Sequence, residues 1–402
     1  MTNRLRITVV LTVLFLLYAG IQLYAVAKAQ AAFALPGPVA AGLVVWVGLM
    51  TVLPLLLWRL ERRGGHRLVV TGAWVGYSWM GFAFLFFWIA LGVDLLALAA
   101  RLWEAGPRLT PRQSFLLANT LTLGVAGYGF AAARRPRIER VTLTTPKLPE
   151  PLRIVLLSDV HLGAMLGRRR LRRILARVRE LDPDLLLSAG DLVDGQTDRL
   201  NGLAPQLAEL APRLGKFAVT GNHEFFAGIE RALDFHARAG FTVLRGTAVE
   251  IGALTIAGVD DPTGAMLGVA VHRDEHALLA GRRPGFTILL KHQPVVDPWA
   301  AGRFDLQLSG HVHHGQIFPF GLLVRLSYPM ATGLTRLAGG WLYVSRGTGT
   351  WGPPLRVLAP PEITLIELRP AQVETLSIAA SNPAETNREK FTQPCSTKMV
   401  LA

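Results

Sequence analysis

Four stretches without a charged residue dominate the first third of this chain. They cover residues 7–27, 38–58, 68–93 and 113–133. Each is long enough for the roughly 20 residues that a helix needs to cross a hydrocarbon core of about 30 Å. A bilayer core offers no water to backbone groups, so we expect all four to be helices. The composition agrees, because 51% hydrophobic and only 17% charged residues exclude an ordinary soluble protein.

Basic residues are unevenly distributed around these stretches. The net charge is +14, and residues 1–150 hold 15 Lys and Arg against 5 Asp and Glu. Eleven of those basic residues lie on the side of the N-terminus and 4 on the opposite side. The positive-inside rule then predicts a cytoplasmic N-terminus, and an even number of spans predicts a cytoplasmic C-terminal part. We expect a multi-pass protein of the bacterial inner membrane, and no nucleic-acid partner, which would favour a basic stripe on a soluble domain.

The first and third stretches each have a second interpretation. Arg4 and Arg6 precede the first stretch and small residues follow it, as in a cleaved signal peptide. Its apolar run exceeds the roughly 7 to 15 residues of a signal core, which favours a permanent span. Asp94 follows the third stretch directly, and we interpret it as a boundary residue rather than a functional intramembrane acid.

The pattern changes at residue 152 to short apolar runs that alternate with amphipathic stretches, which is typical of a layered α/β domain. We divide the chain into a transmembrane region (1–134), a linker (135–151), an α/β domain (152–370) and a disordered tail (371–402). Residues 168–181 predict a helix, because apolar residues recur there at helical spacing. The predicted strands are 153–158, 185–188, 217–220, 254–259, 286–290, 305–308, 341–345 and 363–368.

Three further features bear on surfaces and chemistry. Seven Arg residues occupy the polar face of the 168–181 helix, either as a solvated face or as a contact for anionic headgroups or a substrate phosphate. Residues 319–338 form an apolar insertion, interpreted as a lid or a membrane-dipping loop. The single cysteine, Cys395, excludes an intrachain disulfide and a cysteine-based zinc site.

Side chains able to bind metal ions recur where predicted strands end. Ligands collect at the carboxyl ends of strands in open α/β sheets, so we expect these loops to converge on one site. Asp, Asn and His together suit hard or borderline divalent metals, and these candidates are too many for one tetrahedral ion but enough for two that share a bridge. The candidate ligands are Asp159, His161, Asp191, Asn222, His292, His311 and His313.

The order Asp-x-His, Gly-Asp-x-x-Asp, Gly-Asn-His-Glu, an isolated His and Gly-His-x-His resembles the calcineurin-like metallophosphoesterases over about residues 152–368. The resemblance implies two β-sheets flanked by helices, so the expected fold class is a four-helix transmembrane region followed by an α/β layered sandwich. It implies that His223 is the catalytic acid, that Asp191 bridges the metal ions at the reacting centre, and that Asp194 orients a ligand. The implied ligands are Asp159, His161, Asp191 and His313 for the first ion, and Asp191, Asn222, His292 and His311 for the second.

The multi-span N-terminus and residues 345–352 and 361–364 resemble the bacterial membrane-associated branch of this family. That branch includes UDP-2,3-diacylglucosamine pyrophosphohydrolases. One departure from the family pattern is His314, which stands where Gly is expected and which bears on substrate specificity.

The chemistry expected of such a site is phosphate ester hydrolysis. Two metal ions about 3.5 to 4 Å apart lower the pKa of a shared water and align it with phosphorus. We therefore expect a membrane-anchored hydrolase that cleaves a phosphoester or pyrophosphate by a metal-bridging hydroxide, with manganese, iron or zinc, on a lipid-linked substrate. One alternative is a soluble-nucleotide phosphodiesterase or phosphatase that is merely anchored. Another is a non-catalytic membrane sensor or transport component that binds a phosphorylated ligand.

Two weaker motifs favour structural interpretations. Gly347, Gly349 and Gly352 match G-x-G-x-x-G, but two prolines follow where a dinucleotide site needs a helix, so we expect a Gly-rich turn. His272 and His276 lie four residues apart without the zincin order between them, so we expect a solvated helix.

Overall fold

Four long helices form the N-terminal part of the computed structural model, which describes residues 3–63, 66–103, 108–195, 200, 202–281, 284–330 and 332–371. They are α1 (Asn3–Phe33), α2 (Gly37–Arg63), α3 (His66–Leu102) and α4 (Pro111–Ala133). Each contains a stretch long and apolar enough to cross a membrane. The four expected spans are therefore helices. α1, α2 and α3 continue beyond the predicted ends and include flanking polar residues.

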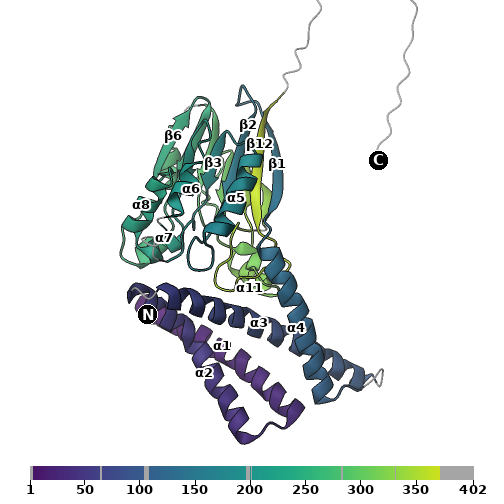
Figure 1. The fold of residues 1–402 in the computed structure, drawn as a ribbon. Helices are drawn as coiled ribbons and strands as arrows, with labels where there is room; N and C mark the ends of the chain where they lie inside the picture. The colour runs from purple at the N-terminus through teal and green to yellow at the C-terminus, as the bar shows by residue number, and fades with distance from the viewer. Residues whose placement is uncertain are drawn as a thin grey trace, which may run out of the picture.

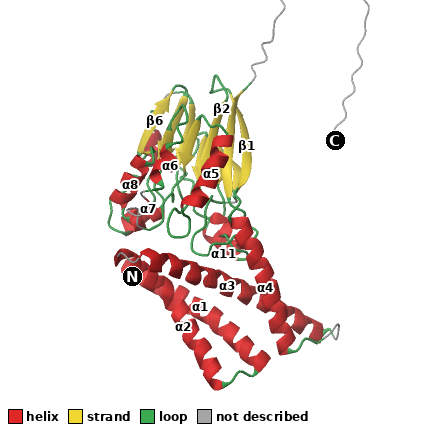
Figure 2. Ribbon diagram, in the orientation of Figure 1, coloured by secondary structure: helices red, strands yellow, loops and turns green. Residues whose placement is uncertain are grey.

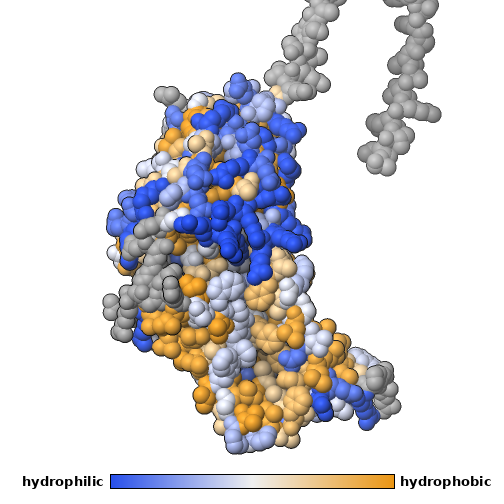
Figure 3. All heavy atoms as spheres, viewed as in Figure 1, coloured by the Kyte–Doolittle hydropathy of each residue, from blue (hydrophilic) through white to orange (hydrophobic). Residues whose placement is uncertain are grey.

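The outer surface of this bundle is apolar. Leu16, Val45 and Leu96 are 61%, 72% and 72% exposed, respectively, and Figure 3 shows the hydrophobic colour gathered over the four helices and the hydrophilic colour over the rest. Large exposed apolar surfaces are unfavourable in water, and they match the acyl chains of a bilayer. This protein is a membrane protein.

A polar cluster connects the helices inside the bundle. Lys28 Nζ lies 2.5 Å from Asp94 Oδ1, and the Tyr24 hydroxyl donates to Asp94 Oδ2 at 2.6 Å. Ser114 of α4 accepts from Lys28 at 2.9 Å. Asp94 does not end the helix, because α3 continues to Leu102, and its carboxylate contacts side chains of α1 and α4; its place relative to the membrane boundary stays a prediction.

Two six-stranded sheets form the C-terminal part (Figures 1 and 2), which confirms the expected α/β layered sandwich. The first sheet has the order β1-β12-β2-β3-β4-β5 and the second β10-β11-β9-β8-β7-β6. Each of the eight predicted strands is found, with ends shifted by at most two residues. The bounds are β1 Arg137–Thr145, β2 Leu152–Leu157, β3 Leu185–Ser188, β4 Lys216–Ala218, β5 Thr242–Val243, β6 Thr247–Ile251, β7 Leu254–Gly258, β8 Phe286–Leu290, β9 Leu306–Ser309, β10 Gly333–Leu337, β11 Gly340–Val344 and β12 Glu362–Pro370.

The two faces of β2 show how the layers pack. Ile154 and Leu156 point into a core shared with the second sheet, whose members include Ile288 of β8. Val155 and Leu157 point the other way, into a core shared with the helices. This alternation follows from the two-residue period of a strand. The helices are α5 Arg168–Glu180, α6 Ala204–Ala208, α7 Asn222–Ala227, α8 Ile229–Arg238, α9 Thr263–Met266, α10 Glu275–Leu279 and α11 Phe320–Ser327.

Residues 135–151, expected to be a linker, contain the edge strand β1 instead. β1 pairs in parallel with β12 from Arg137↔Glu362 to Thr145↔Pro370. Its alternation of charged and apolar residues is that of an edge strand with one buried face, which resembles a polar connection in sequence. Only residues 134–136 separate α4 from this sheet. The expected tail lies outside the described residues, apart from Ala371.

The apolar insertion at 319–338 has regular structure. It contains the helix α11 and the strand β10, which pairs with β11 as an antiparallel hairpin. α11 lies between the membrane helices and the sheets in Figure 1. The expected single helix around His272 and His276 is wrong, because α10 begins at Glu275 and leaves His272 outside it.

The membrane helices pack directly against the α/β domain. Leu85 of α3 and Ala126 of α4 share a buried cluster with Leu355 and Val357. The backbone amide of Arg356 also donates to the carbonyl of Gly129 in α4 at 3.0 Å. A Cβ atom at Gly129 would lie 3.2 Å from Leu355 Cβ, so the absence of a side chain permits this close approach.

Candidate metal centre

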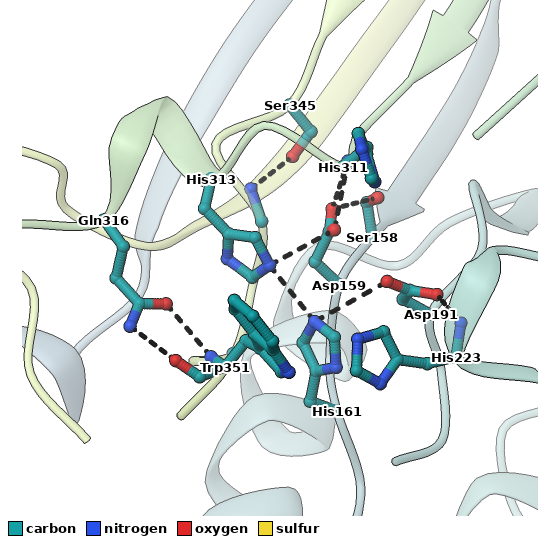
Figure 4. Close-up of polar contacts among 12 residues, drawn as sticks. Ser158, Asp159, His161, Asp191, His223, His311, His313, Gln316, Ser345 and Trp351 are labelled. Atoms are coloured by element: carbon teal, nitrogen blue, oxygen red, sulfur yellow. Dashed lines mark hydrogen bonds and ion pairs between the residues drawn. The ribbon is translucent and has the colours of Figure 1, made fainter. Parts of the chain in front are cut away.

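The polar motifs meet at the carboxyl ends of both sets of parallel strands. Asp159 and His161 follow β2, Asp191 follows β3, and His223 lies at the start of α7 after β4. His311 follows β9 of the second sheet. Figure 4 shows their side chains pointing toward one another from these separate loops. The structure therefore brings together the residues that the sequence predicts.

Tight backbone turns aim these side chains. Asp159, His161, Asp191, His311 and His313 have φ values of 52°, 53°, 53°, 70° and 47°. Residues other than Gly rarely adopt this left-handed region, and strained backbone of this kind clusters at functional sites. Five of the ten non-Gly residues with positive φ in the described part of the chain are candidate ligands, so the strained backbone is concentrated at these motifs.

The first group of candidate ligands is Asp159, His161 and His313. Their ligand atoms all lie within 4.8 Å of one another, as one metal ion would require. His161 Nε2 lies 3.1 Å from His313 Nε2, and His313 Nε2 lies 3.4 Å from Asp159 Oδ1. All three residues are buried. The ring nitrogens converge on a point that the carboxylate also faces.

The second group is Asp191, His292 and His311, whose ligand atoms also lie within 4.8 Å of one another. His292 Nε2 is 3.2 Å from Asp191 Oδ2. Asn222 joins this group, because its Oδ1 is 3.1 Å from His311 Nδ1. His292 Nδ1 donates to the carbonyl of Ala189 at 2.7 Å, which orients the ring so that Nε2 faces the site.

Asp191 lies between the two groups. Its Oδ2 is 3.2 Å from His292 of the second group and 3.8 Å from His161 of the first. Its Oδ1 accepts the backbone N–H of His223 at 2.8 Å. A Cβ atom on Gly221 would collide with this carboxylate, so the Gly of the Gly-Asn-His-Glu motif makes room for it.

His223 is held at the edge of both groups by Asp194. Its Nδ1 lies 2.9 Å from Asp194 Oδ1, and its ring packs edge-on against that of His161 at 4.6 Å. A hydrogen bond of this kind fixes the orientation of the ring and leaves Nε2 available. The sequence predicts that Asp194 orients a metal ligand, whereas the structure places its hydrogen bond on His223, the expected acid.

Burial and charge set the protonation states. Burial lowers the pKa of His223, but the carboxylates of Asp191 and Asp194 outweigh it and raise that pKa to about 9. Burial and the neighbouring His223 lower the pKa of His161 to about 4. Burial opposes the charge of Asp191, yet His292 and His223 hold its pKa well below the usual range. At neutral pH, Asp191 is anionic, His161 is neutral and His223 is cationic.

Glu224 supports the site, a role that its place in the Gly-Asn-His-Glu motif does not predict. The side chain is fully buried and accepts four backbone hydrogen bonds. Oε2 accepts from Gly221 at 2.6 Å and Asp191 at 3.0 Å, and Oε1 accepts from Leu192 at 2.9 Å and Val193 at 3.3 Å. A Glu three residues after a helix N-cap is a capping signal that indicates part of this role.

Arg356 is a second supporting residue that sequence patterns do not reveal. Its side chain is fully buried. It donates to the carbonyls of Arg346, Gly349 and His313 at 2.7, 2.7 and 2.9 Å. Its Nη2 lies 3.0 Å from His313 Nδ1, and burial followed by the Arg356 charge lowers the pKa of His313 well below the usual range. Arg356 thus ties the Gly-rich turn to the Gly-His-x-His loop.

His314 and the Arg-rich helix occupy defined positions. His314 has a φ of 52° and its Nδ1 lies 2.7 Å from Thr332 Oγ1, so its ring bonds toward the segment before β10. On α5, Arg170 donates to the carbonyl of Ala133 at 2.5 Å and to Thr350 at 3.3 Å. The other six Arg residues of that face are exposed.

An open groove of about 1390 Å³ adjoins the candidate metal centre. His292 contributes to its lining together with Asp261, Glu275 and Lys291. Lys291 pairs with the buried Glu275 at 2.5 Å, and Asp261 accepts from Gln293 at 2.9 Å. The groove therefore has a mixed polar and apolar lining and meets the candidate metal centre at His292.

Comparisons with known proteins agree with this geometry. A family model described as calcineurin-like phosphoesterase matches residues 152–315. An uncharacterized metallophosphoesterase of Aquifex aeolicus is 44% identical over 239 residues, which cover 58% of this chain and 92% of that protein. One from Helicobacter pylori is 34% identical over 312 residues, 76% of this chain and 83% of that protein. A transmembrane protein with metallophosphoesterase domain from Danio rerio is 36% identical over 274 residues, 64% of this chain and 63% of that protein.

Proposed function

The chain belongs to the metallophosphoesterase family, and from that premise we propose that it is a membrane-anchored, dimetal-dependent phosphohydrolase. The observation that carries the proposal is the position of Asp191. Its carboxylate lies 3.2 Å from one group of candidate ligands and 3.8 Å from the other. A carboxylate shared in this way is what two neighbouring metal ions require.

The donor set fits two divalent ions. Buried polar atoms normally have a hydrogen-bond partner, yet His292 Nε2 is buried without one. His292 Nε2 faces Asp191, as a metal ligand would. Asp, Asn and neutral His suit manganese, iron and zinc alike. The proposed ligands are Asp159, His161, Asp191 and His313 for the first ion, and Asp191, Asn222, His292 and His311 for the second.

Bound ions would supply Lewis acidity and neutralise the phosphate oxygens. The chain itself would move the proton. His223 is the residue placed to donate it, because Asp194 engages Nδ1 and leaves Nε2 as the nitrogen free to face a leaving oxygen. Asp194 would keep the ring aimed at that oxygen through the 2.9 Å contact with Nδ1.

The anchor supports a lipid-linked phosphoester or pyrophosphate as the substrate, since the domain begins three residues after α4. The excess of basic residues on the N-terminal side supports a cytoplasmic domain in a bacterial inner membrane. The soluble-nucleotide alternative predicts that only a soluble ester is cleaved. The non-catalytic alternative predicts that no ester is turned over.

The first test is hydrolysis by the full-length protein in detergent with manganese. Bis(4-nitrophenyl) phosphate reports phosphodiester cleavage, and UDP-2,3-diacylglucosamine reports lipid pyrophosphate cleavage through release of UMP. Asp191→Asn should abolish both activities. Asp182→Asn is the matched control, because that side chain is 94% exposed. Cleavage of the soluble ester alone would favour the soluble-nucleotide alternative, and no metal-dependent turnover of either ester would contradict the proposal.

A deletion of residues 1–140 is not a suitable test of the anchor. It would cut β1 after its first four residues and remove half of the pairing with β12. Any loss of activity would then report damage to the sheet. A truncation that begins at residue 135 keeps this strand complete.

A further inference from the structure

Helix α11 presents apolar side chains to the outside at the entrance of the candidate metal centre. Leu322, Leu323 and Leu326 are 56%, 55% and 82% exposed, and Phe318 and Phe320 are about half exposed. No residue of α11 is buried. A contiguous apolar patch of this kind is uncommon on a water-facing surface and marks a contact with a partner or a membrane. We call these five residues the α11 face.

The α11 face is continuous with the membrane helices. The ring of Phe320 lies 6.3 Å from the ring of Phe84 in α3, which is itself 6.3 Å from the exposed Trp88. In Figure 1, α11 lies against the middle of α3 and beside the C-terminal end of α4. The α11 face therefore adjoins the apolar surface of the membrane helices.

The α11 face is also close to the candidate ligands. Only five residues separate His314 from Phe320, and Gly315 packs backbone to backbone against Gly321. At the C-terminal end, the ring of Tyr328 lies 5.2 Å from that of His311. Both ends of α11 are thus fixed to the Gly-His-x-His loop, and whatever α11 contacts is brought to the metal centre.

A second apolar contact lies on the other side of the centre. The rings of Phe226 and Trp351 lie 5.4 and 5.8 Å from the ring of His223. Both side chains are slightly more than half exposed. A substrate surrounded by water would leave these apolar rings exposed, which is unfavourable. A substrate whose phosphate adjoins acyl chains would cover the rings with those chains, which is favourable.

We propose that the α11 face and Phe226 insert into the headgroup and upper acyl region of the leaflet nearest the domain. This placement opens the candidate metal centre at the depth of lipid phosphates, so that a membrane lipid is the substrate class. Arg325 in the last turn of α11 and the exposed Arg134 and Arg135 after α4 complement anionic headgroups at the same level. The substrate class rests on the proposed function, whereas the insertion itself does not.

Depth-dependent fluorescence quenching tests the insertion without any assay of activity. The chain has one cysteine, so Cys395→Ser gives a background without thiols. Leu326→Cys, Phe226→Cys and Trp299→Cys are then each labelled with an environment-sensitive dye in the full-length protein. The vesicles contain phosphatidylethanolamine and phosphatidylglycerol, with or without brominated acyl chains. Trp299 is the control, because it is 79% exposed and lies in the connection between β8 and β9, outside α11 and α7.

We expect bromine to quench the dye at position 326 at least twofold, to quench it at 226 to a smaller extent, and to leave 299 unchanged. Equal signals at 326 and 299 would overturn the proposal, and would leave a protein partner as the explanation for the apolar face. Leu322→Ser combined with Leu323→Ser should reduce the quenching at 226 by half or more, because α11 would no longer hold the entrance of the candidate metal centre in the leaflet. Unchanged quenching at 226 in this variant would overturn that role of α11.

The same samples separate this proposal from the proposed function. Strong quenching in the labelled Leu326→Cys variant, together with a wild-type protein that hydrolyses neither ester described above, would refute the proposed function and support the insertion. Hydrolysis of the soluble ester without quenching at 326 would do the opposite. Circular dichroism of each labelled variant verifies that it is folded.

Discussion

Glu224→Gln tests whether one buried carboxylate holds the loops of the candidate metal centre together. The carboxylate accepts four backbone N–H groups, two on each oxygen, from the Gly-Asp and Gly-Asn loops. Gln keeps the size of the side chain but has one acceptor oxygen. Its NH₂ group would face two N–H donors, so two of the four hydrogen bonds would be lost without a change in shape.

The expected magnitude follows from those two bonds. A hydrogen bond to a charged group contributes about 1.5 to 3 kcal/mol, so their loss in a fully buried position costs about 3 to 6 kcal/mol. For a domain of this size, each kcal/mol lowers the Tm by about 2 to 4 °C. We therefore expect the Tm to fall by at least about 6 °C. Loss of a partner that orients ligand loops lowers metal affinity by roughly 10- to 100-fold.

The measurement is thermal unfolding in detergent together with the metal content after dialysis against a weak chelator. Glu180→Gln is the control, because that side chain is 62% exposed on α5 and pairs only with Arg177. A Glu224→Gln protein whose Tm and metal content equal those of the control would refute the reasoning. It would show that the loops hold their shape without the charged acceptor.

Three further substitutions have defined outcomes. Arg356→Met leaves at least three carbonyls without their charged donor. The free energy of unfolding should therefore fall by about 3 kcal/mol or more, with reduced metal content. An unchanged Tm would contradict this. Lys28→Met removes the partner of Asp94 within the bundle, and its free energy of unfolding should fall by about 1 to 3 kcal/mol, since the pair is partly exposed. The double variant Lys28→Met/Asp94→Leu should recover part of this loss in the same unfolding measurement. A further decrease would show that the pair is not the cause. His314→Gly loses one hydrogen bond but relieves a left-handed backbone, so its effects of about 1 kcal/mol each should nearly cancel; a Tm change above about 5 °C would show that His314 has another structural role.

The strands and the convergence of the motifs could be predicted from sequence because both depend on local patterns. An apolar run followed at once by Asp, Asn or His identifies a strand and the end that bears the ligand. The parallel topology then brings such ends together. β1 could not be predicted, because its charged residues belong to an exposed edge and resemble those of a connection.

The supporting residues of the site could not be predicted for a different reason. Glu224 bonds to the Gly-Asp loop and Arg356 to the Gly-His-x-His loop, both distant in sequence, and no local pattern records those partners. The length of α3 could not be predicted either, because a charge was expected to end the helix, whereas Lys28 and Tyr24 pair with Asp94 and α3 continues past it. The roles of the individual ligands remain predictions that metal analysis of the variants would test.

The short passage from α4 to β1 has a consequence for how this protein encounters its substrate. A flexible tether would let the domain sample a hemisphere of solution above the bilayer. Three residues between a spanning helix and a sheet strand, with Arg170 bonded to the last turn of that helix, exclude such sampling. A lipid-linked substrate of the kind proposed above would then be met by lateral diffusion in two dimensions. The encounter rate would follow the surface density of that lipid in the leaflet, and dilution of the surrounding solution would leave it unchanged.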